Sequence, residues 1–492
     1  MSARSRELFG LLPVSLIVAA GFAAVLATRT ENVSDATLTY GAFFLGLCVL
    51  AHLFIRARLP DADPYMFPLA AALAGIGLVL IYRLDAELAR EQAQWFVVGL
   101  AFFCVTILLV EDHHVLERYR YLIAAASIGL LLMPRLPGIG AQVNGAFLAI
   151  KVGPIQFQPA EFAKLGIIVF LASYLRETGD ILVRPRLRPL PYKRQLILWG
   201  IPAVLTLLGI AVLGLGLAGS LLLAVFLFSF AAVIRDRPSP KHFGPLLLVW
   251  GLAMLMLIII RDLGSSLMFF GGFLALLYVA TGRLSLIGVG STMFFGGAFF
   301  LAENISHVHD RVQVWLDPFS QERVRCPSTG EVTEFVNCQG YQLSQSLFAQ
   351  ADGGLFGQGF GQALLEVPGG ATLLPAAHTD LIYAVLANEA GLFGAAGLIG
   401  AYLLLVYRGF RTALSAGDGF SKLLATGLTA VLAFQVFVIV GGVTRVIPLT
   451  GVTLPFVSYG GSSIVANMVL LALLLIVSDH ARSEAQRRGG LV

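Results

Sequence analysis

Long apolar runs separated by short polar segments dominate this chain. Each run is about long enough to cross a lipid bilayer as a helix, which takes roughly 20 apolar residues. Because the runs recur along the whole chain, the pattern predicts a helical membrane protein that crosses the bilayer many times. We expect about fourteen spans, at approximately 10–28, 38–55, 65–82, 93–110, 120–134, 162–175, 196–213, 216–234, 243–260, 264–281, 285–302, 380–407, 421–443 and 455–477.

The run from His378 to Arg408 contains the most informative polar positions. It opens with His378-Thr379-Asp380 and then continues almost entirely with apolar residues and glycine. A carboxylate at membrane depth is costly, so such residues usually face a cavity or a partner and indicate function. Asp380 lies at the mouth of the span, and Glu389 lies about two and a half helical turns further along. This pattern favours an enzyme or a transporter over a simple anchor.

The composition agrees with an all-α polytopic membrane protein. Of the 492 residues, 57% are hydrophobic and only 13% are charged, which excludes a soluble domain of this length. With the N-terminus inside, most of the 33 lysines and arginines fall in the segments on that side, so we expect both termini to be cytoplasmic. Membrane lipids are expected partners, and nucleic acid is not.

On this topology, the unusual polar segments gather on the outer side, at 135–161, 261–264, 303–379 and 444–463. The inner loops are short and basic, without recognisable chemistry, so we expect the function to be performed from outside. The segment 303–379 is long for a structureless connection. Within it, 342–349 predicts an amphipathic helix, and Cys326 and Cys338 could form a disulfide or remain two thiols.

Two acidic positions on the outer side have both a structural and a functional interpretation. Glu161 and Lys164 share a helix face that starts at Pro159, and they could either neutralise each other or hold an anionic headgroup. Asp380 could cap its helix, which would lower its pKa. Burial in an apolar mouth would instead raise the pKa toward that of a general base.

The last outer segment, 448–463, is rich in proline, glycine and hydroxyl groups, which are tolerated at membrane depth only inside protein or beside a wet cavity. Ser458, Ser462 and Ser463 have no His/Asp arrangement of a serine hydrolase. Hydroxyls and amides here could hold a pyrophosphate, with Arg445 as the one cation nearby. Walker motifs, zinc spacings and dinucleotide fingerprints do not occur in the sequence, so no metal ligands are predicted.

Together these motifs resemble the SEDS (shape, elongation, division, sporulation) family, of which RodA and FtsW are the best-known members. The resemblance covers roughly residues 65–478 apart from one insertion. It is carried, in order, by Gln158-Pro159-Ala160-Glu161-Phe162-Ala163-Lys164, Asp262-Leu263-Gly264, Gly340-Tyr341-Gln342, His378-Thr379-Asp380 and the segment from Leu454 to Ser463.

The resemblance implies a peptidoglycan glycosyltransferase that polymerises lipid II at the outer face of the bacterial cytoplasmic membrane, beside a class B penicillin-binding protein. Asp380 matches the essential aspartate of the family and would deprotonate the acceptor sugar 4-hydroxyl. Lys164 and Arg445 would stabilise the leaving diphosphate. Trp95 matches a family position that is important for activity, Glu161 and Lys164 match a pair that lines the cavity, and His378 opens the His-Thr-Asp motif. All of these residues would contact substrate. No cofactor is assigned, and a divalent cation stays open.

The resemblance also suggests a division of the chain. It consists of an N-terminal helix pair (1–60), a ten-helix core (61–189, 243–302 and 380–478), an inserted hairpin (190–242), the long outer loop (303–379) and a cytoplasmic tail (479–492). The sequence departs from the family at Phe147, where an arginine is usual, and at Asn388, where a glutamate is usual. The extra N-terminal pair looks actinobacterial.

The polar segments expected on the outer side are also compatible with two other functions. A flippase or transporter of lipid-linked precursors would need a cavity but no base, and a non-catalytic scaffold for a penicillin-binding protein would need neither.

Overall fold

The computed structural model describes residues 3–28, 36–136, 139–143, 146–152, 155–183, 192–213, 217–236, 251, 263–304, 306–326, 330–362 and 373–489. The helices are α1 (Ala3–Thr28), α2 (Ala36–Arg58), α3 (Met66–Leu84), α4 (Ala86–Leu109), α5 (His114–Arg118), α6 (Arg120–Leu132), η1 (Met133–Arg135), α7 (Pro159–Val183), α8 (Tyr192–Leu213), α9 (Leu217–Asp236), α11 (Leu263–Thr281), α12 (Leu284–Asn304), α13 (Ser306–Leu316), η4 (Phe335–Asn337), α14 (Tyr341–Gly353), α15 (Ile382–Ser415), α16 (Gly419–Val443) and α17 (Gly461–Gly489).

The predicted helical membrane protein is confirmed. Within the described residues, eight helices are long and apolar enough to cross a membrane. Each of the other predicted spans also contains a helix, except 243–260, of which the structure describes only Gly251; Arg261 and Asp262 lie outside the described residues. The count of fourteen spans and the side on which the termini lie stay predictions.

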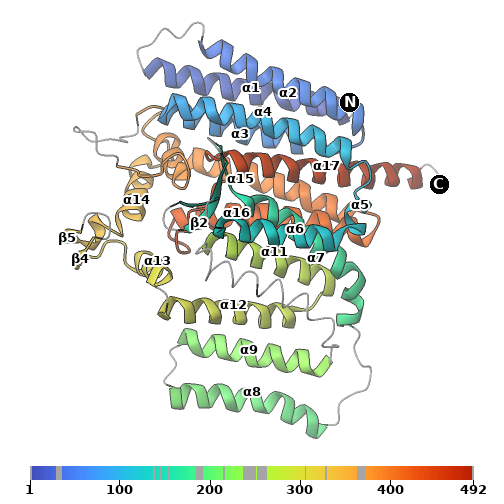
Figure 1. Ribbon diagram of the computed structural model, residues 1–492, viewed down its shortest axis with the longest axis vertical. Coiled ribbons are helices and arrows are strands. Elements are labelled where there is room, and N and C mark those ends of the chain that lie inside the picture. Colours follow the sequence, from blue (N-terminus) through green and yellow to red (C-terminus); the bar gives the residue numbers. More distant parts are fainter. Residues whose placement is uncertain are drawn as a thin grey trace.

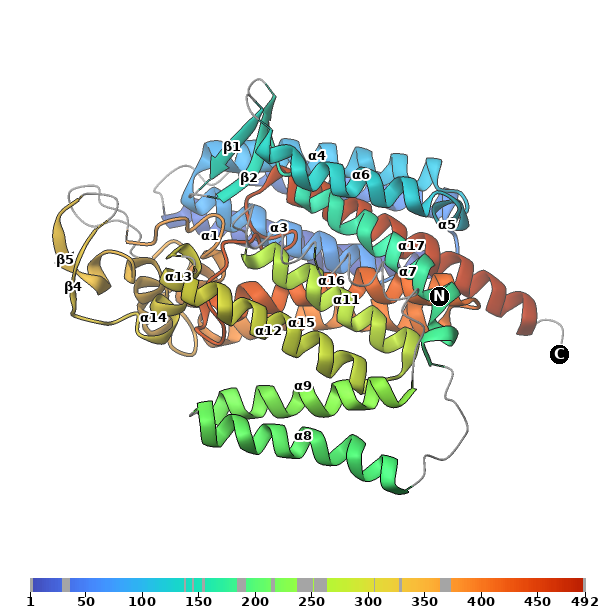
Figure 2. The ribbon, with the colours of Figure 1, turned by 60° about the horizontal axis from the view of Figure 1, so that its bottom comes forward.

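The long helices lie side by side in one bundle (Figure 1). At its centre, α17 packs against α4 and α15, and α16 packs against α15 and α11. The N-terminal pair α1–α2 packs on α3 at one edge, while α9 joins the α8–α9 hairpin to α12 at the opposite edge. Both chain ends lie at the same end of the bundle, and α13, α14 and the strands β4 and β5 lie at the other (Figure 2).

The expectation of an all-α fold needs a correction, because two of the segments predicted to lie outside contain small antiparallel sheets. In 135–161, β1 (Gly140–Val143), β2 (Ala146–Val152) and β3 (Ile155–Phe157) form a three-stranded meander. In 303–379, β4 (Arg323–Arg325) pairs with β5 (Val332–Glu334), and a disulfide joins Cys326 to Cys338. The predicted amphipathic helix at 342–349 is present as α14.

The predicted span 380–407 is not one straight helix. It starts at Ile382 and breaks at Gly391, whose φ of 66° is outside the helical region. The broken backbone is satisfied by the glycine-rich segment after α14, because the amides of Gln358 and Gly359 donate to the carbonyls of Asn388 and Glu389. Close backbone approach explains Gly353 and Gly357, because a Cβ there would lie 2.0 Å from the Ala387 carbonyl oxygen and 2.1 Å from the Glu389 carbonyl oxygen.

Glu389, the interior carboxylate, lies just before this break. Its side chain is fully buried and lies 3.2 Å from Arg83 Nε of α3. A buried carboxylate is stabilised by such a cation, so Glu389 fixes the short first part of α15 against α3.

The prediction of a last span at 455–477 is wrong at its start, and the helix continues beyond its predicted end. The chain from Gly451 to Gly460 is not helical, α17 begins at Gly461, and it continues without interruption to Gly489. The predicted tail 479–492 is therefore mostly the end of a helix. The non-helical segment lies inside the protein, since Leu454, Phe456 and Val457 are buried, as expected for irregular backbone at membrane depth.

Candidate active site

Asp380 lies in the turn that leads into α15, and it does not cap that helix. The N-cap position is Leu381, and its helix end has no side-chain cap. The carboxylate is 9% exposed, and burial raises its pKa to about 6 even though Arg311 and a hydrogen bond from Thr379 lower it. The burial effect expected of a general base therefore outweighs the cation and the hydrogen bond.

Arg311 is the cation beside Asp380, and the sequence analysis missed it. Its Nη1 donates to the Leu449 carbonyl at 2.7 Å. A Cβ placed on Gly451 would lie 3.5 Å from Asp380 Oδ2 and 4.0 Å from Arg311 Nη2. The carboxylate and the guanidinium thus flank the same glycine, and an acceptor hydroxyl near Asp380 would also lie near a positive charge.

Arg445 has a different place from the one expected. Its Nε donates to the Trp315 carbonyl at 2.9 Å, and its Nη2 donates to the Leu316 carbonyl at the end of α13. In return, Trp315 Nε1 donates to the Arg445 carbonyl at 3.1 Å. Arg445 is therefore not the sole cation near 448–463. Its hydrogen bonds fix the end of α13, the helix that carries Arg311, and so help to hold Arg311 beside Asp380.

Lys164 and Glu161 form the predicted pair on the first turns of α7. Both are buried, and Lys164 Nζ lies 2.5 Å from Glu161 Oε2. The ammonium also donates to Gln435 Oε1 at 2.8 Å, and Gln435 Nε2 donates to the Thr453 carbonyl at 2.9 Å. One amide side chain of α16 therefore connects the Lys164–Glu161 pair to the non-helical segment before α17.

The three predicted serines are buried, and their hydroxyls hold this segment in place. Ser458 Oγ donates to the Thr379 carbonyl at 2.6 Å, next to Asp380. Ser462 Oγ accepts from the Gln158 amide at 2.9 Å, and Ser463 Oγ accepts from Thr453 Oγ1 at 2.9 Å. These bonds join the segment to the entry of α15 and to the start of α7. Binding of a pyrophosphate by these serines stays a prediction.

His378 and Trp95 both contact the segment 444–463. The His378 carbonyl accepts from the Tyr459 amide at 2.8 Å, and the two rings meet edge to face at 5.7 Å. Burial lowers the pKa of His378 and so favours its neutral imidazole. Trp95 of α4 packs so closely on Gly461 that a Cβ there would lie 2.3 Å from the indole.

Trp95 and His378 therefore contact the segment 444–463, which contains Arg445 and the three serines. Lys164 is connected to this segment through Gln435, and Glu161 is bonded to Lys164. Arg311 and Gln435 are the additions. The direct neighbours of Lys164 are Glu161 and Gln435, while the charge acting on Asp380 comes from Arg311. The arrangement offers a poised carboxylate with one cation beside it and a second, separately held cation on α7.

Comparison with known proteins gives a consistent family. The family model of the FtsW/RodA/SpoVE cell cycle proteins matches residues 64–237 and 220–483. The peptidoglycan glycosyltransferase RodA of Mycobacterium tuberculosis is 36% identical over 499 aligned residues, which cover 99% of this chain and 92% of that protein. The stage V sporulation protein E of Bacillus subtilis is 27% identical, over 83% of this chain and 95% of that protein.

A solved structure supports the same assignment. One chain of a peptidoglycan synthase complex that coordinates polymerization and crosslinking is 26% identical, with a TM-score of 0.55, and the match covers 85% of this chain and 98% of that chain. The chain belongs to the FtsW/RodA/SpoVE family of cell cycle proteins.

Proposed function

We propose that this protein is a peptidoglycan glycosyltransferase that polymerises lipid II, with Asp380 as the general base. The observation that carries the proposal is the buried carboxylate of Asp380, with its pKa raised to about 6 and Arg311 beside it. At pH 7 this carboxylate is mostly ionised, and it is a stronger base than an ordinary aspartate. The names of the curated mycobacterial relatives support the same activity.

In the proposed reaction, the 4-hydroxyl of the acceptor sugar attacks the anomeric carbon of the donor. Asp380 takes the hydroxyl proton, the new glycosidic bond forms, and the bond to the lipid diphosphate breaks. The diphosphate leaves as an anion and needs no proton, so one carboxylate is sufficient, unlike in glycoside hydrolysis. Lys164 and Arg311 are the cations available to stabilise the leaving charge.

We assign this reaction to the outer face of the cytoplasmic membrane. Arg311 belongs to the same segment, 303–379, as the Cys326–Cys338 disulfide, and disulfides persist in oxidising, extracytoplasmic surroundings. The basic inner loops support the same orientation. A class B penicillin-binding protein is the proposed partner, consistent with the synthase complex among the structural relatives.

The decisive experiment is polymerisation of purified lipid II, followed by gel separation of the glycan products. Asp380→Asn should reduce the rate by at least about 100-fold, because general-base catalysis contributes roughly that much. The matched control is Asp352→Asn, an exposed acid at the end of α14, which should keep wild-type activity. Equal thermal melting of both variants would exclude misfolding.

Three outcomes would contradict the proposal. If Asp380→Asn polymerised lipid II at the wild-type rate, Asp380 could not be the general base. Movement of labelled lipid II across vesicles without any polymer would indicate a flippase. Polymer that forms only through the penicillin-binding protein, with Asp380→Asn still supporting growth, would indicate a scaffold.

A further inference from the structure

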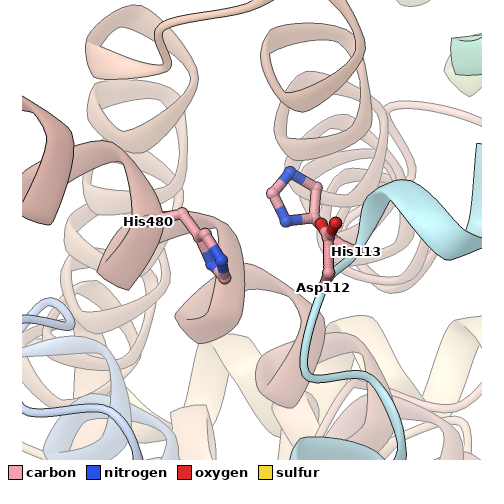
Figure 3. A group of neighbouring side chains, drawn as sticks. All are labelled: Asp112, His113 and His480. Atoms are coloured by element: carbon pink, nitrogen blue, oxygen red, sulfur yellow. The ribbon is translucent and has the colours of Figure 1, made fainter.

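A second cluster of titratable side chains lies at the end of the bundle that carries the chain ends. Asp112 and His113 are on the connection between α4 and α5, and His480 reaches toward them from α17 (Figure 3). One nitrogen or oxygen atom from each of the three lies within 4.8 Å of the other two. None of these residues belongs to the proposed active site.

The hydrogen bonds fix which nitrogen of His113 carries a proton. Ser421 Oγ donates its single hydrogen to the carboxylate of Asp418, which can only accept when ionised. The same Ser421 Oγ contacts His113 Nε2, so it must accept there, and Nε2 holds the proton. His113 Nδ1 is then an unprotonated lone pair.

That lone pair has no protein partner in the part of the chain that the structure describes. His113 is 1% exposed, and its Nδ1 is buried without a hydrogen bond. Leaving a buried acceptor unpaired costs about 1–3 kcal/mol. A ligand that accepts the lone pair of His113 Nδ1 would remove this cost.

The other two side chains present matching atoms. His480 Nδ1 lies 3.1 Å from the Ile476 carbonyl, to which it can only donate, so in the neutral imidazole Nε2 is the nitrogen with a lone pair. Asp112 Oδ1 accepts from the amide and from Nδ1 of His114, at 2.9 and 2.8 Å. These bonds orient the Asp112 carboxylate and engage only one of its two oxygens among the contacts described.

We propose that Asp112, His113 and His480 bind a divalent transition-metal ion, with zinc as the first candidate. Two imidazoles and one carboxylate, with a fourth position for water, form a ligand set that Zn²⁺ commonly takes. The chain Asp418–Ser421–His113 supplies the hydrogen-bonded support that metal-bound histidines usually have. Asp112 is exposed, and its Oδ2 could ligate the ion while Oδ1 keeps its bonds to His114.

The bound ion would connect three parts of the fold. His480 is 367 residues from His113, and the support through Ser421 comes from the first turn of α16. The ion would therefore join α17 and the α4–α5 connection to the start of α16, far from Asp380. Its binding does not depend on the proposed glycosyltransferase activity.

The test uses the full chain in detergent, purified without a histidine tag and stripped with a chelator. Titration with Co²⁺, followed by its visible absorption, should saturate at one ion per chain, and Zn²⁺ should displace it. His480→Gln and His113→Gln should each weaken binding at least about tenfold, and Ser421→Ala by about 10–100-fold as an outer-shell change. His309→Gln on α13 is the matched control and should bind as wild type does.

Thermal melting supplies the second measurement. Added Zn²⁺ should raise the Tm of the wild-type protein and of His309→Gln, but not the Tm of His480→Gln, which replaces a half-buried side chain and should fold even if His113→Gln does not. The proposal is overturned if the wild type shows no saturable site for one ion. It is equally overturned if His480→Gln binds Co²⁺ as tightly as the wild type.

Discussion

Asp380 is subject to opposing influences on its pKa. Burial disfavours the charged form, while Arg311 and the Thr379 hydroxyl favour it, and the result is a pKa of about 6. A general base works only when it is deprotonated. The polymerisation rate should therefore fall as the pH drops through about 6, and it should be nearly constant above neutral pH if no other group titrates.

Replacement of Arg311 tests this balance. Arg311→Ala removes the positive charge that lowers the pKa of Asp380, so the acid limb of the pH–rate profile should move upward by about one unit or more. Arg311→Lys keeps the charge and should leave the limb near its wild-type position. Initial rates of lipid II polymerisation across the acidic and neutral range provide the measurement. An acid limb that does not move in Arg311→Ala would show that Arg311 does not act on the base.

At this scale the sequence identifies residues whose signal is local. Asp380 is evident from its place at the mouth of an apolar run, and the Glu161–Lys164 contact follows from their i, i+3 spacing. Arg311 gives no such signal. It lies in a long loop, and only tertiary bonds, such as the one to the Leu449 carbonyl, bring it to Asp380.

At the scale of elements, the break in α15 determines where Asp380 can be. Gly391 has a positive φ, and a Cβ there would lie 2.3 Å from the Gly357 amide and 2.5 Å from the Leu355 carbonyl. The break lets the short first part of α15 pack inside the protein, while the helix as a whole is long and apolar enough to cross a membrane. Hydropathy could not reveal it, because a glycine inside an apolar run does not interrupt the apolar pattern.

Gly391→Ala should therefore destabilise the protein. The positive φ alone costs about 1–3 kcal/mol for a residue other than glycine, and the neighbouring backbone atoms cannot yield as a side chain could. Gly397→Ala is the matched control, since a Cβ there meets nothing within 4 Å and alanine is the better helix former. Thermal melting in detergent should show a clear loss for the first and no loss for the second. Equal melting of the two would contradict the strained break.

The outer sheets and the start of α17 escaped prediction for a related reason. In 135–161 the strands are short, and their pairing is what makes them strands. Before α17, Leu454, Phe456 and Val457 are as apolar as a membrane helix, yet they belong to an irregular segment held by side-chain bonds such as Ser458 to Thr379. Hydropathy reports burial in both cases and cannot report backbone conformation.

At the scale of the whole molecule, hydropathy and charge were sufficient for the class of protein and for most helix positions. The arrangement of the extra helices at opposite edges of the bundle was not available from the sequence, because it depends on which helix faces match. The predicted orientation in the membrane depends on the distribution of basic residues. It can be tested by labelling the two cysteines of the disulfide from outside the cell.

In spheroplasts, a membrane-impermeant thiol reagent should label the protein only after reduction, because Cys326 and Cys338 are bonded to each other and are expected to face outward. Cys48 and Cys104 lie within α2 and α4 and should stay unlabelled. The variant with serine at both loop positions should give no signal, and mass spectrometry identifies the labelled residues. Labelling that requires permeabilised membranes would place the loop inside.

The unbroken course of α17 has a mechanical consequence. The helix begins at Gly461 beneath Trp95 and carries His480 about 28 Å further along its axis, at a rise of 1.5 Å per residue. A continuous helix resists compression, so any sliding or rotation imposed near the C-terminal end of α17 would be transmitted to Ser462 and Ser463. The single continuous helix α17 thus connects the region around Ser462 mechanically to the opposite end of the protein.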